Sequence, residues 1–299
     1  MNFGRVAEYA LTDIDFSLPN DGQFTQQILT GPHGQQTKFF VGCQSMSTDA
    51  WIGTIFKSGT QTKDMNSRYV AKFNSVDYPG FSYNNDSFTA TKSFIANCEI
   101  NPNKEFLFFP RISNKISHTN RLVNVDELNN RFVDLAKIFG SNLGGCYLQM
   151  SDTFGVDSWT SLKNYLETFP KDIKLFVEMR GKDWFKKSLM RNQYFQLLSE
   201  LEIGTVISDT PGRRDVLHME LTTPELFVRF DGTGRRSDYH RIDEWVKRIK
   251  LWVDNGLRQV NFFVSEPDES QTPALAQYVI KKFNDRLNAS LQDLEFSRF

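Results

Sequence analysis

An acid and a guanidinium stand two residues apart at the end of a short apolar run, Lys174–Val177. Glu178 follows the run directly, and Arg180 precedes a turn at Gly181. Side chains two apart on a strand share a face, so the carboxylate could act as a base or hydrogen-bond acceptor beside a guanidinium that clamps an anion. The alternative is an ion pair that neutralises itself at the rim of the fold.

Composition restricts the class of protein. The chain has 299 residues, and its 35 Lys and Arg nearly balance its 36 Asp and Glu. A globally basic protein that coats nucleic acid or an anionic membrane is therefore not expected. The apolar runs are strand-sized, which argues against a membrane span, and the N-terminus has no apolar segment typical of a secretory signal. The cysteines are few, odd in number and widely spaced (Cys43, Cys98 and Cys146), which suits a reducing cytosol. We predict a cytoplasmic protein.

From Lys38 onward, apolar runs alternate with amphipathic runs at a spacing of roughly 30 residues, the length of a βα unit. The expected strands are Lys38–Gly42, Ser75–Tyr78, Phe106–Pro110, Gly145–Gln149, Lys174–Val177, Gly204–Ile207, Leu226–Phe230 and Arg258–Val264. The expected helices are Lys63–Phe73, Phe88–Asn97, Asp126–Gly140, Val156–Phe169, Asn192–Leu201, Ile242–Asn255 and Pro273–Arg286. The segment Asp209–Glu225 is short and rich in Pro, Gly and Arg, so no full helix is expected there.

Eight such units predict a single-domain (β/α)8 TIM-like barrel of the α/β class. The barrel is expected over residues 37–290, with residues 1–36 as an N-terminal extension that packs on it and residues 291–299 as a C-terminal tail. A doubly wound open sheet is the alternative. Such a sheet would often carry a glycine-rich phosphate loop after its first strand, and Val41–Ser45 does not match one.

Ligands of such barrels bind at the carboxyl ends of the strands. Polar side chains follow nearly every expected strand, including Gln44, Glu266 and Asp268. Our candidates for proton transfer are Glu178, Asp77 and Asp209. Our candidates for ligand contact are Arg180, Arg229, Gln149, Arg111, His118, Tyr83 and Asp231. Because Asp and Ser also cap helices at strand–helix turns, each acid has an alternative structural interpretation.

Two loops rich in Gly and Arg, Asp209–Arg214 and Asp231–Arg236, follow the sixth and seventh expected strands. Loops at these positions often hold phosphate, although exposed Arg beside Asp is also typical of ordinary solvated loops. No pair or cluster of His and Cys has the spacing of metal ligands, so no metal site is expected. A carboxylate-only Mg²⁺ site built from Asp77, Glu178 and Asp209 is a minor alternative. The cofactor is unknown.

Several segments, in order along the chain, resemble the YecE-like family, also called domain of unknown function 72. Val177–Phe185 resembles its "VEFRHPSWF", Leu148–Phe154 its "LQLPPSF", and Phe73–Asp77 with Tyr83 its "FNTVEINSTFY". Pro110–Ile112 with His118 resembles "KAPRLITH", and Ser208–Gly212 and Phe227–Gly232 resemble "ADSPG" and "YVRLHG". The resemblance covers roughly residues 38–268.

The resemblance implies a TIM-like barrel with these motifs at the strand ends and no established activity. Kinship with barrels like sugar isomerases or endonuclease IV is an analogy of fold. The chain departs from the family pattern at three places: "GTSGW" reads Gly42–Met46, the His of "RLHG" is Asp231, and "FNN" becomes Phe263–Ser265. It is therefore identified as a somewhat divergent member.

Three functions follow from these residues. The first is a protein that binds an anionic, for instance phosphorylated, small molecule at the barrel mouth, with Glu178 or Asp77 as a base if it is an enzyme. The second is a non-catalytic ligand-binding or interaction protein. The third and least favoured is a nucleic-acid-binding protein, with the Arg loops on phosphates. The sequence does not predict the oligomeric state.

Overall fold

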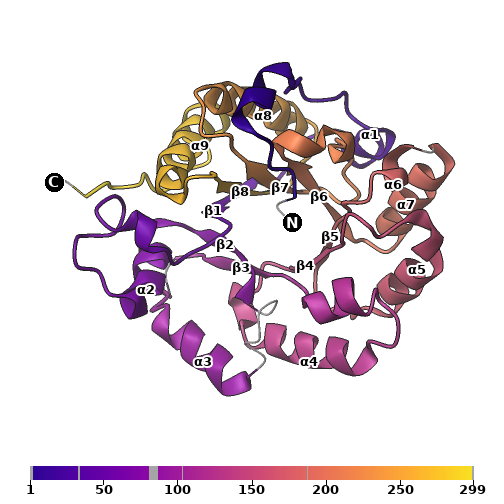
Figure 1. The fold of residues 1–299 in the computed structure, drawn as a ribbon, viewed down its shortest axis with the longest axis horizontal. Helices are drawn as coiled ribbons and strands as arrows, with labels where there is room; N and C mark the ends of the chain where they lie inside the picture. The colour runs from indigo at the N-terminus through magenta and orange to yellow at the C-terminus, as the bar shows by residue number, and fades with distance from the viewer. Residues whose placement is uncertain (1–2, 33, 81–86, 103, 187, 298–299) are drawn as a thin grey trace.

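Eight parallel strands form a nearly closed barrel surrounded by helices (Figure 1). The computed structural model describes residues 3–32, 34–80, 87–102, 104–186 and 188–297. The strands are β1 Lys38–Cys43, β2 Ser75–Tyr78, β3 Leu107–Pro110, β4 Cys146–Gln149, β5 Leu175–Glu178, β6 Gly204–Asp209, β7 Glu225–Asp231 and β8 Gln259–Ser265. Their order, β3-β2-β1-β8-β7-β6-β5-β4, is that of a barrel. The predicted TIM-like fold is confirmed.

The seam of the barrel lies between β3 and β4. These two strands are the ends of the hydrogen-bonded order, and isolated bridges from Phe108 to Leu143 and from Arg111 to Tyr147 join them. The backbone N–H of Ile112 donates to the carbonyl oxygen of Tyr147 at 2.9 Å. The seam is thus closed near the carboxyl ends of both strands, where the candidate site lies.

Helices follow most strands. They are α1 Gln23–Ile28, α2 Thr62–Lys72, α3 Phe88–Asn97, α4 Asp126–Lys137, α5 Trp159–Thr168, α6 Asp183–Lys186, α7 Ser188–Glu200, α8 Ser237–Asp254 and α9 Thr272–Leu287. Among the residues described, no helix is both long and apolar enough to cross a membrane. As predicted, a short 3-10 turn, Pro211–Val216, replaces a full helix between β6 and β7.

The helix α8 begins at Ser237 rather than at the predicted Ile242. Its first turn is polar, so the apolar periodicity that we used to predict helices does not extend to it. The carboxylate of Asp238 accepts the backbone N–H groups of Thr233 and Arg235, at 2.7 and 3.2 Å, and pairs with Arg241 one turn later at 2.8 Å. These bonds stabilise the start of the helix without an apolar residue.

Aromatic side chains fill the interior of the barrel. The ring of Phe109 lies 5.3 Å from those of Phe227 and Phe263, and 6.2 Å from that of Phe176, between ring centroids. The four rings come from β3, β7, β8 and β5 and belong to one buried cluster. They form an apolar floor beneath the carboxyl ends of the strands.

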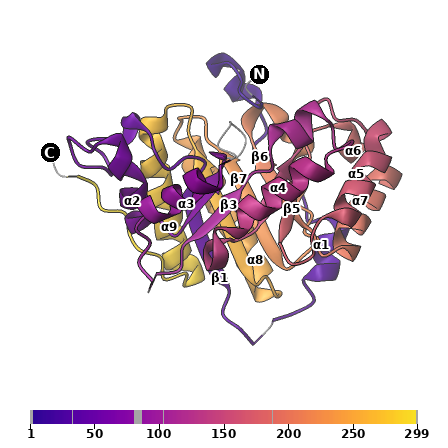
Figure 2. The same ribbon diagram turned by 90° about the horizontal axis from the view of Figure 1, so that it is seen from below.

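The N-terminal extension runs down the outside of the barrel. Figure 2 shows its first residues at the end of the molecule where the N-terminus is marked, and its last residues looping under the opposite end before β1. Between these ends, α1 packs on α7, with the rings of Phe24 and Phe195 6.1 Å apart. Thr25 Oγ1 donates to the carbonyl oxygen of Met219 at 2.8 Å. The extension therefore contacts both the mouth and the wall of the barrel.

Candidate functional site

The polar layer of the site lies directly above the aromatic floor because side chains alternate along each strand. Phe176 faces the interior from β5, so Glu178 two residues later faces the same way. On β7, Phe227 is followed in the same phase by Arg229 and Asp231. The alternation of side chains along β5 and β7 therefore directs Glu178, Arg229 and Asp231 toward the mouth of the barrel.

Arg229 is the centre of this layer. Its Nε donates to Asp77 at 2.8 Å, one terminal nitrogen donates to Glu178 at 3.0 Å, and the other donates to Gln44 Oε1 at 2.6 Å. The side chain is 9% exposed. Burial alone would lower the pKa of Arg229, but the carboxylates of Glu178 and Asp77 raise it well above its usual value. Arg229 is therefore a fixed cation that links β1, β2, β5 and β7.

Glu178 accepts hydrogen bonds from four side chains in all. Besides Arg229, its donors are Arg180 Nε at 2.7 Å, Gln149 Nε2 at 2.7 Å and Ser208 Oγ at 3.0 Å. Burial would raise the pKa of Glu178, but Arg180 and Arg229 outweigh it and hold the pKa at about 2. A carboxylate so strongly stabilised as the anion is a weak base. Its contacts favour a positioning role for Glu178.

Further bonds extend the layer around the barrel. Tyr147 donates its hydroxyl to Asp77 at 2.5 Å, and Arg111 donates to Gln149 Oε1 at 3.1 Å. On the other side, Asp231 Oδ1 accepts from Gln44 Nε2 at 2.9 Å and from Ser265 Oγ at 2.8 Å. Residues from all eight strands or their following loops are thus joined in one hydrogen-bonded network.

A cavity of about 320 Å³ opens above this network. Its walls include Arg180, Arg229, Asp231 and Glu266, together with residues 3–6 of the N-terminal extension. No hydrogen bond joins the two terminal nitrogens of Arg180 to any residue that the structure describes. The cavity therefore has a guanidinium whose Nε is fixed and whose outer edge is free to bind.

Glu266 is a buried carboxyl group in the wall of this cavity. It is 8% exposed, and its Oε2 accepts the backbone N–H of Gly234 at 2.9 Å. Burial, followed by the nearby carboxylate of Asp238, raises the pKa of Glu266 to about 7. A carboxyl group with such a pKa can both donate and accept a proton near neutral pH. We expected Glu266 near the mouth but did not assign it a role.

Asp209 lies outside the network. It is the last residue of β6, and its side chain is directed toward the helices, where it pairs with Arg241 at 2.7 Å and with Arg214. Trp245 donates its indole N–H to Asp209 at 2.7 Å. Burial opposes ionisation, but the two arginines hold its pKa below the usual range. The structure does not bring Asp209 together with Glu178 and Asp77, so the three do not form a common carboxylate site.

Two other candidates have different placements. His118, in a π-helical turn Lys115–Thr119, is 2.8 Å from Ser117 Oγ through its Nδ1. Burial first, then the charges of Arg180 and Arg111, lower the pKa of His118, so it is close enough to the mouth to be influenced by it. His118 is not among the residues that line the cavity. Tyr83 lies outside the described residues.

The arginines of the two Gly/Arg loops are largely engaged. Arg213 donates to the carbonyl oxygen of Arg180 at 2.7 Å and pairs with Asp215 at 2.9 Å. Arg214 pairs with Asp209, and Arg235 donates to the carbonyl oxygen of Glu8 at 2.7 Å. These loops support the mouth and the N-terminal extension, and Arg180 remains the guanidinium best placed for a ligand.

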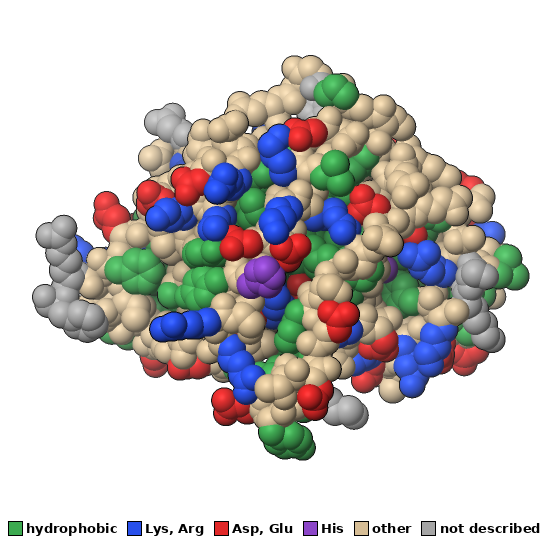
Figure 3. Space-filling model, turned by 90° about the horizontal axis from the view of Figure 1, so that it is seen from above, with side chains coloured by type: hydrophobic (Ala, Val, Ile, Leu, Met, Phe, Trp, Pro, Cys, Tyr) green, Lys and Arg blue, Asp and Glu red, His purple; other side chains and the backbone are tan. Residues whose placement is uncertain are grey.

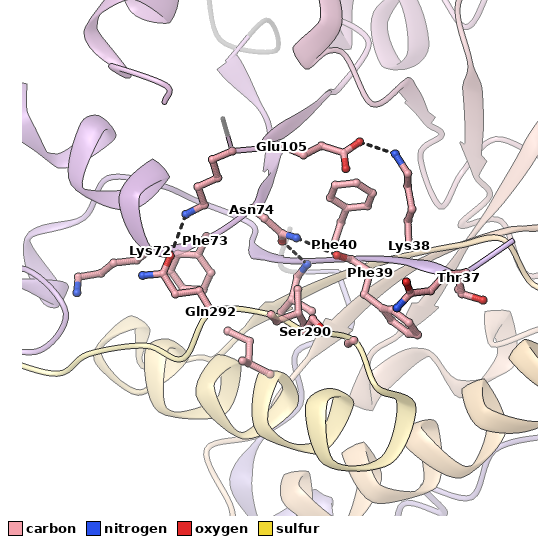
Figure 4. A pocket seen from close by; sticks show the side chains of 16 residues that line it. Thr37, Lys38, Phe39, Phe40, Lys72, Phe73, Asn74, Glu105, Ser290 and Gln292 are labelled. Carbon is pink, nitrogen blue, oxygen red and sulfur yellow. Dashed lines mark hydrogen bonds and ion pairs between the residues drawn. The ribbon is translucent and has the colours of Figure 1, made fainter. Parts of the chain in front are cut away.

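A second cavity, of about 630 Å³, lies at the opposite end of the barrel (Figure 4). Lys38 pairs there with Glu105 at 2.8 Å, and Asn74 bonds the backbone of β1 through both its amide nitrogen and its oxygen. Lys104 donates to the carbonyl oxygens of Val70 and Ala71. The polar groups here bind one another, so this cavity is a weaker candidate site.

Figure 3 shows the face formed by the elements at the top of Figure 1, among them α8, with Lys and Arg side chains gathered near its middle and acids between them. On α8 the basic residues have acidic partners: Lys247 pairs with Glu244, Arg248 with Asp21, and Lys250 with Asp254. Such a mixed face has no extended positive stripe of the kind that follows a nucleic-acid backbone.

Comparison with known proteins identifies the family of this barrel. The family model described as "Protein of unknown function DUF72" matches residues 40–295. The chain belongs to the DUF72 family. The resemblance of its motifs to that family is therefore confirmed. The UPF0759 protein YecE of Escherichia coli K12 is 23% identical over 190 residues, which cover 57% of this chain and 69% of that protein.

Two solved DUF72 structures share the fold. A DUF72 family protein of Thermotoga maritima has a TM-score of 0.63 at 19% identity, covering 83% of this chain and 99% of that one. A DUF72 family protein of Enterococcus faecalis has a TM-score of 0.65 at 17% identity, covering 84% and 99%. At these identities the likeness shows the fold alone.

Three residues of the segments that we interpreted above as differing from the resembled motifs lie together: Gln44, Asp231 and Ser265. Asp231 accepts hydrogen bonds from both of the others. All three line the cavity, beside Arg180 and Arg229.

Proposed function

We propose that the cavity at the mouth of this DUF72 barrel binds a small anionic molecule, with Arg180 as its anion contact. The observation that carries the proposal is the state of Arg180. Its Nε is fixed by Glu178, while its two terminal nitrogens have no acceptor among the described residues and border the cavity. A guanidinium held in this way presents two parallel donors, the arrangement that carboxylate and phosphate oxygens bind.

The surrounding charges support this assignment. All three nitrogens of the Arg229 guanidinium donate within the network, to Asp77, Glu178 and Gln44, so Arg229 contributes a rigid wall. In its protonated form, Glu266 is a neutral hydrogen-bond donor in the same cavity, compatible with an anion nearby. If the ligand is transformed, Glu266 is the residue that would exchange a proton with it, and Glu178 and Asp77 would position the guanidiniums. A cavity of this size suits a small metabolite.

The test is a titration with inorganic phosphate, followed by nuclear magnetic resonance or calorimetry. The substitution Arg180→Met keeps much of the side-chain volume and removes the charge, so it should weaken phosphate binding by about tenfold or more. Arg121→Met is the matched control. Arg180 lies over the ring of Phe3, with its guanidinium carbon 4.0 Å from the ring centroid. Arg121 likewise lies over an aromatic ring, that of Phe154 at 5.2 Å, but it does not line the cavity. Equal phosphate affinity in the wild type and Arg180→Met would overturn the proposal.

A further inference from the structure

The start of the chain lies over the candidate site. Residues 3–6 line the cavity, and Figure 1 shows the indigo start of the described chain near the centre of the ring of strands. The guanidinium carbon of Arg180 is 4.0 Å from the centroid of the Phe3 ring, and that of Arg213 is 4.9 Å from it. Two guanidiniums therefore converge on one aromatic ring at the wall of the cavity.

Other contacts hold both guanidiniums in this arrangement. Arg180 is fixed through its Nε by Glu178 at 2.7 Å. Arg213 is fixed by Asp215 at 2.9 Å and by its donation to the carbonyl oxygen of Arg180 at 2.7 Å. None of these bonds involves Phe3. The place between the two guanidiniums is thus shaped for a flat ring by the barrel itself, and removing Phe3 would leave it intact.

The segment that carries Phe3 docks through a close approach of two glycines. The backbone N–H of Gly212 donates to the carbonyl oxygen of Gly4 at 2.7 Å. Gly4 has a φ of +75°, and a Cβ there would lie 2.0 Å from Thr210 Oγ1. A Cβ at Gly212 would lie 2.8 Å from the oxygen of Gly4. The docked conformation is therefore specific, because a side chain at either glycine would obstruct it.

The next anchors along the chain are Glu8, whose carbonyl oxygen accepts from Arg235 at 2.7 Å, and the buried Leu11. Arg5 is exposed, and Tyr9 a few residues further on is 84% exposed. Within the described part of the chain, residues 3–6 have one backbone hydrogen bond to the barrel and the contacts of the Phe3 ring with two guanidiniums. A short segment with so few bonds belongs to the part of a fold that opens most readily. The segment can leave without disturbing the network below it.

We propose that Phe3 occupies a subsite for a planar aromatic ring of the ligand, and that residues 3–6 are its displaceable intramolecular competitor. The ligand class is then an aromatic or heteroaromatic ring that bears an anionic group. The ring lies between Arg180 and Arg213, where cation–π attraction favours it, and the anionic group enters the adjoining cavity. This inference rests on the proposed function, because the same guanidinium of Arg180 binds the anion.

Two probes separate the ring from the anion: phenyl phosphate, which has both, and inorganic phosphate, which has only the anion. Two variants undock the segment by different means. Phe3→Ala removes the competing ring, and Gly4→Val prevents docking while leaving Phe3 present. If the segment is docked about nine-tenths of the time, both variants should bind phenyl phosphate about tenfold more tightly than the wild type. Their affinity for inorganic phosphate should change much less, because phosphate contacts Arg180 and does not compete for the place of the Phe3 ring.

Trypsin reports displacement directly, because the bond after Arg5 lies within the segment. Phenyl phosphate should speed cleavage after Arg5 in the wild type, inorganic phosphate should not, and Gly4→Val should be cleaved fast without either probe. Suppose that inorganic phosphate binds, but that the wild type, Phe3→Ala and Gly4→Val bind phenyl phosphate with equal affinity. This result would overturn the ring subsite and leave the proposed function standing. Failure of both probes to bind any of the proteins would overturn both.

Discussion

Ser208 and Asp209 are neighbours on β6, and their side chains lie on opposite sides of the barrel wall. Ser208 donates to Glu178 inside the mouth at 3.0 Å, whereas Asp209 accepts from Trp245 of α8 outside it at 2.7 Å. Of these two adjacent residues, Ser208 therefore belongs to the candidate site, whereas Asp209 stabilises the packing of α8 on the barrel. This relationship leads to the first prediction.

Asp209→Asn should destabilise the protein and leave its phosphate affinity unchanged. The substitution leaves Arg241, which is 3% exposed, without its full charge partner. Breaking a buried pair in this way costs roughly 3 kcal/mol, measurable by urea unfolding. Ser208→Ala is the companion variant, expected to cost about 1 kcal/mol. A well-folded Asp209→Asn protein that has lost phosphate binding would contradict this assignment.

Glu178→Gln should lower the free energy of unfolding by roughly 3–5 kcal/mol, because it leaves two guanidiniums against a neutral amide in a buried site. The same chemical change at Glu105, whose partner Lys38 is exposed, should cost less than about 1 kcal/mol. Urea denaturation of both variants at neutral pH gives the comparison. Equal stability of the two variants would show that the network contributes little to the fold.

Glu266 should make the protein less stable as the pH rises through neutrality. Its pKa is raised to about 7 in the folded state from an ordinary value of 4.5, so between these values the folded chain holds a proton that the unfolded chain has released. The stability from this group is present below pH 4.5 and is lost as the pH rises through 7.

Glu266→Gln removes this titration, so the variant should gain roughly 2 kcal/mol on the wild type between about pH 5 and pH 8. Asp268→Asn is the control, because the pKa of the exposed Asp268 is lowered by its bonds with Ser270 and its titration lies below this range. Chemical denaturation at a series of pH values measures the difference. A difference that stays constant over the range would contradict the assigned pKa of Glu266.

The barrel could be predicted because each strand is an apolar run between turn residues, and because the runs recur at the length of a βα unit. The expected run Ser75–Tyr78, for example, is the observed β2. The start of α8 at Ser237 could not be predicted in this way, because hydrogen bonds to the carboxylate of Asp238, and not apolar residues, stabilise it.

The site was predictable only in part. Strand ends indicated Glu178, Arg180 and Arg229, which the structure joins in one network. The alternation along β6 could have shown that Asp209 faces away from the mouth. Val206 belongs to the interior cluster, so Ser208 two residues later faces the mouth and Asp209 does not. Tyr147 of β4 belongs to the same interior cluster as Phe176 and Phe227, and Gln149 two residues later faces the mouth in the same way. No local pattern indicates the contact between Phe3 and Arg180, because it joins distant parts of the chain.

The docked N-terminal segment also constrains the order in which the protein assembles. The backbone N–H of Phe24 bonds Glu220 across 196 residues, and Gly4 bonds Gly212 across a comparable separation. These bonds need strands β5 to β7 and their loops, which leave the ribosome much later than residues 3–28. Residues 3–6 can therefore dock only after β6 and the loop that follows it have been made, so the cavity lacks this wall until then.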